Sequence, residues 1–333
     1  MSIGEPTAPA PAAAPDIPDD WRGAVVAIGN FDGVHRGHQA VLAAARREAH
    51  RLGVKALILT FEPHPRAFFG KGAPFFRLTP APLKTAVAKA FGMDGALVLP
   101  FDEQLARVTA EAFVRDVLVE RLAIRHAATG YDFHFGYRRL GTPAFLEAAG
   151  ASHGFGVTVV GEYDQAGLPV SSTRIRTALR DGDIDAANAL LGWRWSIAGE
   201  IVHGDKRGRD LGYPTANMAL DPAVELAHGI YAVRLARPDG SVHDGVASFG
   251  RRPTFDNGRA LFETFLFDFS DDLYGATVLV ALVGRIRPEL RFESADALVA
   301  QMDADSIDAR ALLAHAPDSA VDAAIRHAYL TPR

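Results

Sequence analysis

Two histidines three residues apart, His35 and His38, belong to a segment that reads AVVAIGNFDGVHRGHQAVL over residues 24–42. Apolar residues at its start predict a buried parallel strand, glycines predict a turn, and helical spacing begins near His38. Ligands of open α/β sheets bind at the carboxyl ends of strands, and free amides at a helix start favour phosphate. Two imidazoles on one helical turn could stabilise the charge that develops as pyrophosphate leaves a nucleotide.

Other interpretations of the histidine pair stay open at this point. Histidines at this spacing, taken alone, are more often a surface or capping pair. Zinc binding would need a third ligand, and the chain has no cysteine. The strand and the glycines before the pair favour phosphate, because glycine lets a ligand approach the backbone. Asp32, with these glycines and the strand, therefore favours a phosphate at this turn.

Hydroxyl and guanidinium groups precede another predicted helix in SSTRIR, residues 171–176. Hydroxyls at a helix N-terminus with two arginines nearby can form a second phosphate clamp. The alternative is a helix cap followed by solvated arginines. Together with GNFDGVHRGH, the segment resembles the nucleotidyltransferase superfamily, which joins an adenylyl or cytidylyl group to a phosphate. The resemblance implies phosphate binding by Ser171, Ser172, Thr173 and Arg174. It also implies binding of ATP phosphates at the first turn, by Gly29, Asn30, Phe31, Asp32 and Gly37.

Composition limits the possible functions. The chain has 333 residues, enough for two domains, and no cysteine, which excludes disulfides and cysteine nucleophiles. Its net charge is −5, of which residues 1–20 carry −4, so the remaining −1 leaves no basic surplus for nucleic acid. Residues 1–20 are rich in alanine and proline and predict a disordered tail. Because signal-peptide and membrane-span patterns are missing, we expect a cytoplasmic protein that binds neither nucleic acid nor membrane.

Alternating strand and helix patterns over residues 21–185 predict a Rossmann-like, doubly wound parallel sheet. Further strands are expected at residues 55–61, 96–99, 126–131 and 157–160. One helix is expected after Thr79, which could cap it with Pro80 at its first position. Another is expected over residues 110–122. The alternation of strand and helix patterns is expected to end near residues 183–192, and the predicted domain boundary lies there.

Short β runs separated by turns predict a small antiparallel barrel in residues 186–333. The clearest runs are residues 197–202, 229–235, 245–249, 261–267 and 277–283. Helical segments are expected to close the chain, one capped by Ser294 and running through residue 302. The expected fold class is therefore α/β, a Rossmann-like domain followed by a β-barrel domain with closing helices.

Residues 204–217, GDKRGRDLGYPTAN, are predicted to form a glycine-punctuated loop that lacks the GK[ST] of a P-loop. Its amides could hold phosphates, and Thr215 and Asn217 offer hard oxygen ligands suited to Mg²⁺. A bare loop of this kind is more often structural. Glu263 lies in the apolar run LFETFLF, where a carboxylate either faces solvent or has a function. Phe265 and Phe267 share its predicted face, which favours a pocket.

The two halves, in this order, resemble the bacterial riboflavin kinase/FMN adenylyltransferase family, also called FAD synthetases. The matching segments span about residues 25–310 and are GNFDGVHRGHQ, TFEPHP, GYDFHFG, SSTRIR, GDKRGRDLGYPTAN, GIYAV, GRRPTF, FDFSDDLYG and RIRPELRF. The resemblance implies that residues 21–185 adenylylate FMN to FAD and that residues 186–333 phosphorylate riboflavin. It implies ATP as co-substrate at both sites, with Mg²⁺.

The resemblance also implies roles for single residues. His35 and His38 match phosphate-binding histidines, and Glu263 matches the base that takes the proton of the riboflavin 5′-hydroxyl. His64 and Asp132 fall on the FMN side of the adenylylation site. In the kinase, Arg287 would lie by the flavin, and Thr215 and Asn217 would hold the metal. The implied kinase phosphate ligands are Gly204, Lys206, Gly208, Gly212, Pro214 and Thr215.

Three segments depart from the family pattern, and they leave the kinase kinetics open. They are Asp210, Ala247-Ser248-Phe249 and Trp193-Arg194-Trp195. Two other functions also stay open: a nucleotidyltransferase of other substrate fused to a flavin-sensing barrel, and a non-catalytic flavin- or nucleotide-binding regulator. The intact histidines and Glu263 argue against the regulator. The expected partners are riboflavin, FMN and ATP, with the chain a monomer or weak homo-oligomer.

Overall fold

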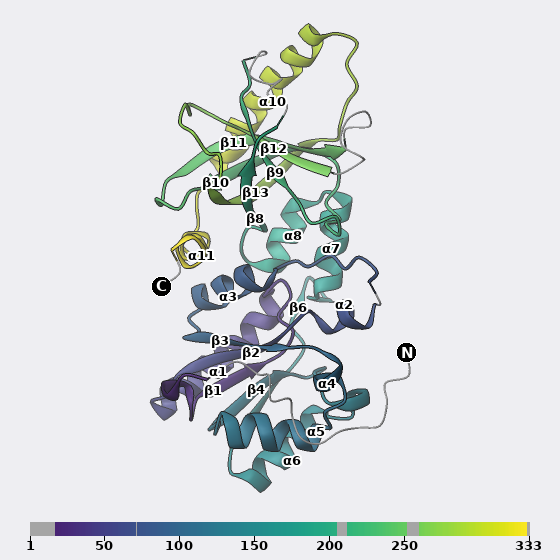
Figure 1. Ribbon diagram of the computed structural model, residues 1–333. Coiled ribbons are helices and arrows are strands. Elements are labelled where there is room, and N and C mark those ends of the chain that lie inside the picture. Colours follow the sequence, from purple (N-terminus) through teal and green to yellow (C-terminus); the bar gives the residue numbers. More distant parts are fainter. Residues whose placement is uncertain (1–16, 71, 205–211, 252–259, 332–333) are drawn as a thin grey trace. The chain divides into compact units, whose positions relative to one another are not determined.

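The computed structural model describes residues 17–70, 72–204, 212–251 and 260–331. Lys206, Gly208 and Asp210, which the sequence analysis singled out, lie outside the described residues. The chain separates into two compact units (Figure 1). The first comprises Met1–Phe75 and Thr79–Ser171, and the second comprises Phe76–Leu78 and Ser172–Arg333. Within the described residues, no helix combines the length and apolar character that a membrane crossing requires.

The first unit is built on a five-stranded parallel sheet in the order β3-β2-β1-β4-β5. Every residue of the central strand β1 is buried, as the apolar run predicts. The chain adds strands on one side of β1 and then on the other, so a topological switch point lies beside β1. This confirms the predicted doubly wound sheet. The strands are β1 (Val25–Ile28), β2 (Ala56–Glu62), β3 (Gly95–Pro100), β4 (His126–Gly130) and β5 (Gly156–Val160).

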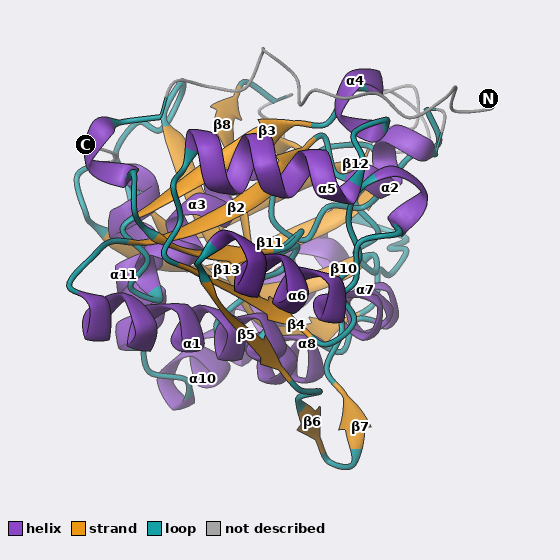
Figure 2. Ribbon diagram, turned by 90° about the horizontal axis from the view of Figure 1, so that it is seen from below, coloured by secondary structure: helices purple, strands orange, loops and turns teal. Residues whose placement is uncertain are grey.

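Helix α1 follows β1 and confirms the predicted strand–turn–helix order. It begins after His35 as N-cap and ends at Gly53, whose φ of 64° is left-handed. A β6–β7 hairpin stands away from the sheet (Figure 2). The helices and hairpin strands of the first unit are α1 (Arg36–Leu52), α2 (Pro65–Phe69), α3 (Ala81–Ala90), α4 (Glu103–Ala106), α5 (Ala110–Ala112), α6 (Pro143–His153), β6 (Asp164–Gln165) and β7 (Leu168–Pro169).

Two local predictions for the first unit were wrong. Thr79 does not cap α3: Pro80 holds the N-cap position and makes no side-chain capping bond. The Thr79 amide donates to Asp32 Oδ1 at 3.0 Å, and its hydroxyl accepts from the Gly33 amide at 2.8 Å. The helix expected over residues 110–122 is α only at its start. Phe113–Arg121 is a π-helix, in which bonds such as Leu122 N to Val117 O span five residues.

The second unit contains a closed antiparallel barrel in the order β10-β11-β12-β9-β8-β13. All five predicted strands are present, and the barrel encloses the fully buried side chains of Tyr231, Phe249 and Phe262. Strand β9 was missed, because its residues were predicted as the end of the glycine loop. Ala216 and Met218 alternate inward, so the pattern of a strand starts directly after Pro214. The strands are β8 (Ser196–Val202), β9 (Thr215–Ala219), β10 (Gly229–Ala236), β11 (Val242–Arg251), β12 (Ala260–Leu266) and β13 (Thr277–Arg287).

The helices of the second unit correct two further predictions. Helix α8 occupies the stretch where helical structure was expected to end, and Asp183 caps it by accepting from the Ala186 amide at 2.9 Å. Helix α10 begins after Ser294, as predicted, but continues past residue 302, because Ala309 and Leu313 pack against the barrel. The helices are α7 (Ser172–Asp181), α8 (Ile184–Leu191), α10 (Ala295–His315) and α11 (Ala320–Leu330).

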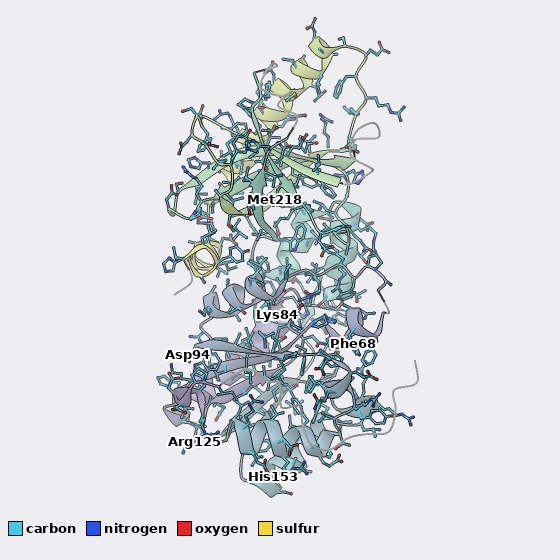
Figure 3. All side chains as sticks on the ribbon, viewed as in Figure 1. Phe68, Lys84, Asp94, Arg125, His153 and Met218 are labelled. Atoms are coloured by element: carbon cyan, nitrogen blue, oxygen red, sulfur yellow. The ribbon has the colours of Figure 1, made fainter. Side chains whose placement is uncertain are left out.

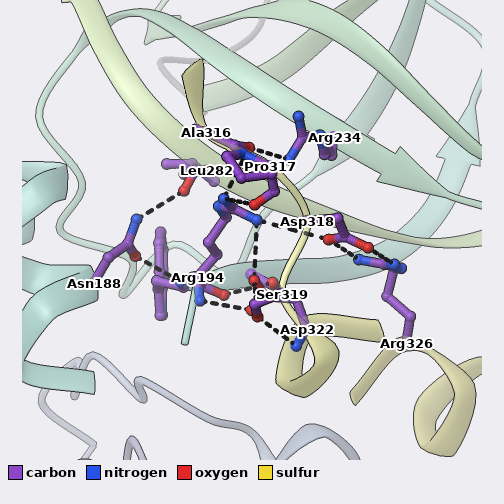
Figure 4. Close-up of polar contacts among 12 residues, drawn as sticks. Asn188, Arg194, Arg234, Leu282, Ala316, Pro317, Asp318, Ser319, Asp322 and Arg326 are labelled. Atoms are coloured by element: carbon purple, nitrogen blue, oxygen red, sulfur yellow. Dashed lines mark hydrogen bonds and ion pairs between the residues drawn. The ribbon is translucent and has the colours of Figure 1, made fainter. Parts of the chain in front are cut away.

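Arg194, in one of the segments that depart from the family pattern, holds the turn between α10 and α11 (Figure 4). Its guanidinium donates to Asp322 Oδ2 at 3.0 Å and to the carbonyls of Ala316 and Pro317 at 3.0 and 2.7 Å. Its backbone amide donates to Asp322 Oδ1 at 2.9 Å. Both side chains of this ion pair are well shielded, with 15% and 7% exposure. The segment before β8 is therefore an anchor for the C-terminal helix.

Candidate active sites

The turn after β1 has a strained backbone. Phe31, Gly33 and Val34 have positive φ angles of 48°, 90° and 40°. Only glycine adopts such angles without cost, so the two other residues must be held there by their surroundings. The buried Asp32 and Thr79 provide that hold through the hydrogen bonds described above. The turn that was predicted to bind phosphate is thus fixed in one conformation.

The two histidines of the motif lie face to face at the start of α1. His35 Nδ1 accepts from the His38 amide at 3.3 Å, and the rings stack with centroids 3.6 Å apart. Phe31 packs edge-on against the other side of His38, at 5.3 Å. Among the described residues, His38 Nδ1 is a buried nitrogen with no hydrogen-bond partner. The predicted pair is therefore one unit, with a ring nitrogen left for a further partner.

The electrostatic environment favours the neutral form of His38. Its pKa lies well below the ordinary value, first because the ring is withdrawn from water, and then because His35, Lys84 and His64 lie near. His64 is itself 4% exposed and caps α2 by accepting from the Arg66 amide at 3.0 Å. An arriving polyphosphate would act on the pKa of His38 in the opposite direction, because negative charge favours protonated imidazole.

The other predicted residues of the adenylylation site have more varied surroundings. Asp132 follows β4 at the same edge of the sheet as the histidine turn, but it is exposed, and its carbonyl contacts His134 Nδ1 at 2.9 Å. Ser171 ends the first unit, and Ser172 begins α7 in the second. Phosphate binding by the residues of α7, Ser172, Thr173 and Arg174, stays a prediction.

The candidate kinase residues meet on two neighbouring strands. Asn217 of β9 is paired with Glu263 of β12, and Thr215 is paired with Phe265. Residues directly opposite in an antiparallel pair project from the same face, as do residues two apart in one strand. Thr215, Asn217 and Glu263 therefore share one face of the barrel. On the other side of Glu263 stands Ser248 of β11, a position at which the sequence departs from the family pattern.

The amide of Asn217 fits the predicted metal site. The residue is 6% exposed, and its Oδ1 has no hydrogen-bond partner among the described residues. Its Nδ2 donates to the Thr215 carbonyl at 3.3 Å, so Oδ1 is the free end. Gly204 lies against the amide, where a Cβ would come within 2.4 Å of Nδ2. A buried, unsatisfied oxygen beside a threonine hydroxyl suits Mg²⁺, which takes oxygen ligands from both protein and substrate phosphates.

The predicted pocket around Glu263 was wrong in one respect. The buried face of β12 is that of Phe262, Thr264 and Leu266, which point into the barrel. Glu263 lies on the outer face and is half-buried, with Phe265 beside it. The carboxylate is thus not enclosed by apolar side chains. Outside the barrel, it is accessible to a substrate that lies across β9 and β12.

Arg287, which the resemblance placed by the flavin, is engaged by helix α10. Its guanidinium donates to both oxygens of Asp305, at 2.7 and 2.6 Å, and Asp305 is 3% exposed. The Tyr213 hydroxyl bonds to Asp303 of the same helix, and its ring contacts Phe265 at 4.7 Å. Sequence reasoning missed both aspartates. Their signal was weak: two carboxylates two residues apart in a helix that was expected to end earlier.

The remaining phosphate residues of the predicted kinase loop lie at its described ends. Gly212 has a left-handed φ of 82°, which suits glycine, and Pro214 leads directly into β9. Gly204, at the other described end of the loop, lies against the Asn217 amide. One cavity, of about 530 Å³, lies elsewhere on the second unit, and its lining includes Arg234 and Arg310 but none of the predicted site residues.

Two family models and several relatives match the chain. The FAD synthetase model matches residues 17–174, and the riboflavin kinase model matches residues 191–313. The bifunctional riboflavin kinase/FMN adenylyltransferase of Pseudomonas fluorescens is 44% identical over 296 residues, which cover 89% of this chain and 94% of the relative. The chain belongs to the bifunctional riboflavin kinase/FMN adenylyltransferase family. The member from Escherichia coli K12 is 39% identical, with coverage of 86% and 92%.

One solved structure has a similar fold over most of the chain. A crystal structure described as that of a macrolide-efflux protein from Streptococcus pneumoniae aligns with a TM-score of 0.78 and 33% identity. It covers 87% of this chain and 94% of that one. Within the family, the two matched domains divide the candidate residues between them. The FAD synthetase match contains His35 and His38, whereas the riboflavin kinase match contains Thr215, Asn217 and Glu263.

Proposed function

We propose that this chain makes FAD from riboflavin in two ATP-dependent steps. The barrel domain, which we assign to residues 186–333, phosphorylates riboflavin to FMN. The sheet domain, residues 21–185, joins FMN to the adenylyl group of a second ATP and releases pyrophosphate. The observation that carries the proposal is that each of the two matched domains contains a separate set of candidate residues. In the first, stacked histidines start α1, and in the second, Glu263 is paired with Asn217.

In the kinase step, Glu263 takes the proton of the riboflavin 5′-hydroxyl while the riboflavin 5′-oxygen attacks the γ-phosphorus of ATP. The bond from that phosphorus to the bridging oxygen breaks, and ADP leaves. Thr215 and Asn217 would hold Mg²⁺, which supplies neutralisation of the phosphate charge when bound. Amides of the loop around Gly204 and Gly212 position the nucleotide. Because phosphoryl transfer needs little covalent chemistry from the protein, positioning supplies most of the catalysis.

In the adenylyl-transfer step, a phosphate oxygen of FMN attacks the α-phosphorus of ATP. The bond between that phosphorus and the α–β bridging oxygen breaks, and pyrophosphate leaves. His35 and His38 donate to the phosphates and stabilise the charge that develops on the leaving group. The Ser171–Arg174 segment supplies the second phosphate clamp, and His64 and Asp132 serve the FMN side. No protein nucleophile is required, which is consistent with a chain that has no cysteine.

The test is to incubate the purified chain with riboflavin, ATP and MgCl₂ and to separate the flavins by chromatography over time. FMN is expected first and FAD afterwards, and EDTA is expected to stop both. FMN that never proceeds to FAD would mean that the sheet domain acts on another substrate. Riboflavin left unchanged, in a preparation that binds flavin, would favour a non-catalytic regulator.

A further inference from the structure

Lys84 is a buried cation at the nucleotide site that belongs to none of the motifs above. It lies in the first half of α3 and is 1% exposed (Figure 3). Its neighbours on the buried side of the helix are apolar, among them Leu83 and Val87. Burying an ammonium group is costly, and a cation in the first turns of a helix also opposes the helix dipole. A charge kept under such conditions is a candidate for a functional role.

Hydrogen bonds connect Lys84 to the phosphate turn. Lys84 Nζ donates to Thr60 Oγ1 at 3.1 Å, and Thr60 Oγ1 in turn donates to the Asn30 carbonyl at 3.1 Å. Thr60 lies in the carboxyl half of β2 and is fully buried, and Asn30 follows β1. The ammonium group therefore lies near the carboxyl edge of the sheet, and one hydroxyl group connects it to the turn that begins the histidine motif.

The charges around this turn are mostly positive or can become so. Lys84 lies close enough to His38 to lower its pKa, and His35 and His64 surround the same ring. The buried carboxylate of Asp32 is the acidic group of the turn, and one of its oxygens already accepts from the Thr79 amide. Fixed positive charge in a water-poor site interacts strongly with an anion, because the surrounding dielectric is low. The arrangement suits a polyphosphate rather than a neutral ligand.

We propose that Lys84 is a positioning residue for adenylyl transfer. Its ammonium group supplies positive charge near the ATP polyphosphate, and its hydrogen bond to Thr60 fixes the Asn30 carbonyl of the turn. The inference rests on the adenylyl transfer proposed above for the first unit. Lys84 acts through the turn and through His38. Removal of its charge leaves the histidine pair in place but weakens the attraction that holds the polyphosphate against it.

The test compares four variants of the full-length chain. Lys84→Met removes the charge but keeps a side chain of similar length, and Lys84→Arg keeps the charge. Thr60→Val removes the hydroxyl that connects Lys84 to the Asn30 carbonyl. Lys89→Met is the matched control, because Lys89 lies on the same helix but is exposed. For each variant, kcat and KM for ATP are measured with supplied FMN, and riboflavin kinase rate and thermal midpoint are measured on the same preparation. The pKa of His38 is followed by NMR, with its signal assigned from a His38→Gln spectrum.

The expected loss of kcat/KM for ATP in Lys84→Met is about 100-fold, the usual effect of removing one preorganised electrostatic group. The kinase rate is expected to be unchanged. The pKa of His38 should rise in this variant, because a neighbouring positive charge has been removed, but not in Thr60→Val. Lys84→Arg should retain most of the activity, and Lys89→Met all of it.

Several results would overturn the proposal. One is a folded Lys84→Met variant with kcat/KM near that of the wild type. Another is a loss of activity without any change in the pKa of His38, which would show that Lys84 serves folding alone. If Lys84→Met does not fold, Lys84→Gln replaces it, and failure of both to fold would assign Lys84 a structural role. A wild-type chain that makes no FAD from FMN would instead refute the underlying function.

Discussion

At the scale of single residues, Glu263 has polar neighbours on both adjoining strands, Asn217 and Ser248. Its half-buried position allows it to meet a substrate hydroxyl without the cost of an enclosed charge. We therefore propose Glu263 as the base because of its place beside Thr215 and Asn217. Burial alone would not distinguish it from a solvent-facing glutamate.

Glu263→Gln should lower the rate of riboflavin phosphorylation by about 10²–10⁴-fold, because the amide keeps the shape but cannot accept the proton. FAD synthesis from supplied FMN should continue. The matched control is Glu200→Gln, since Glu200 is an exposed glutamate on barrel strand β8. The rate is measured at saturating riboflavin and ATP. A Gln variant that keeps more than about a tenth of the wild-type rate would show that Glu263 only orients the substrate.

The sequence predicted those residues whose role depends on local order. From helical spacing alone, the sequence predicted a helix that begins near His38, and α1 begins close to that position, after His35 as N-cap. It could not predict the partners of Thr79 or Lys84. Thr79 bonds to a turn 46 positions away, and Lys84 bonds to Thr60, 24 positions away. Such contacts exist only after the strands have paired, so an alternating pattern gives no sign of them.

At the scale of elements, the C-terminal helix α11 depends on one buried ion pair. Asp322 accepts from both the backbone amide and the guanidinium of Arg194 (Figure 4). Ser319, the N-cap of α11, also donates to Asp322. Loss of the carboxylate would leave the shielded guanidinium with only the longer ion pair to Asp318 Oδ1, at 3.6 Å, which is more costly than loss of an exposed pair.

Asp322→Ala should therefore destabilise the second unit by about 3 kcal/mol, within the usual range for breaking a buried ion pair. The control is Asp308→Ala, because Asp308 is exposed on α10. Thermal unfolding and limited proteolysis after residue 315 report the change, and α11 should be released first. Equal thermal midpoints for Asp322→Ala and the control would show that the ion pair does not hold the helix.

The elements that were mispredicted owe their form to tertiary contacts. Helix α10 continues beyond residue 302 because Ala309 and Leu313 pack on the barrel, although the helix has little amphipathic pattern of its own. Strand β9 is short and polar at its start, so Thr215 and Asn217 were assigned to a loop. The long apolar strands of the sheet and barrel, by contrast, were predictable from composition and spacing alone.

Helices α7 and α8 raise the question of where the kinase domain begins. Asn188 of α8 donates to the Leu282 carbonyl on β13 at 3.0 Å and accepts from the Trp195 amide at 2.8 Å. A fragment from residue 172 to 333 should therefore fold and phosphorylate riboflavin without making FAD. A fragment from residue 190 lacks these contacts and should have a lower thermal midpoint. Equal midpoints would show that residues 172–189 do not stabilise the kinase domain, and an unfolded 172–333 fragment would show that the domain needs the rest of the chain.

At the scale of the whole molecule, one chain carries two candidate sites of unlike chemistry. A histidine pair lies at the carboxyl edge of the sheet, and the carboxylate of Glu263 lies on the outer face of the barrel beside Thr215 and Asn217. The product of the second site, FMN, is the substrate of the first. Each site should thus be removable by a single substitution without loss of the other, because the two sets of residues lie in separately matched domains.

The measurement that tests this claim most directly is the flavin product profile of His38→Ala and Glu263→Gln, supplied in turn with riboflavin and with FMN. His38→Ala should convert riboflavin to FMN at the wild-type rate and form FAD about 100-fold more slowly. Glu263→Gln should form almost no FMN from riboflavin but convert supplied FMN to FAD normally. A folded variant of either kind that loses both activities together would contradict the account, because the two sites would then not be separate.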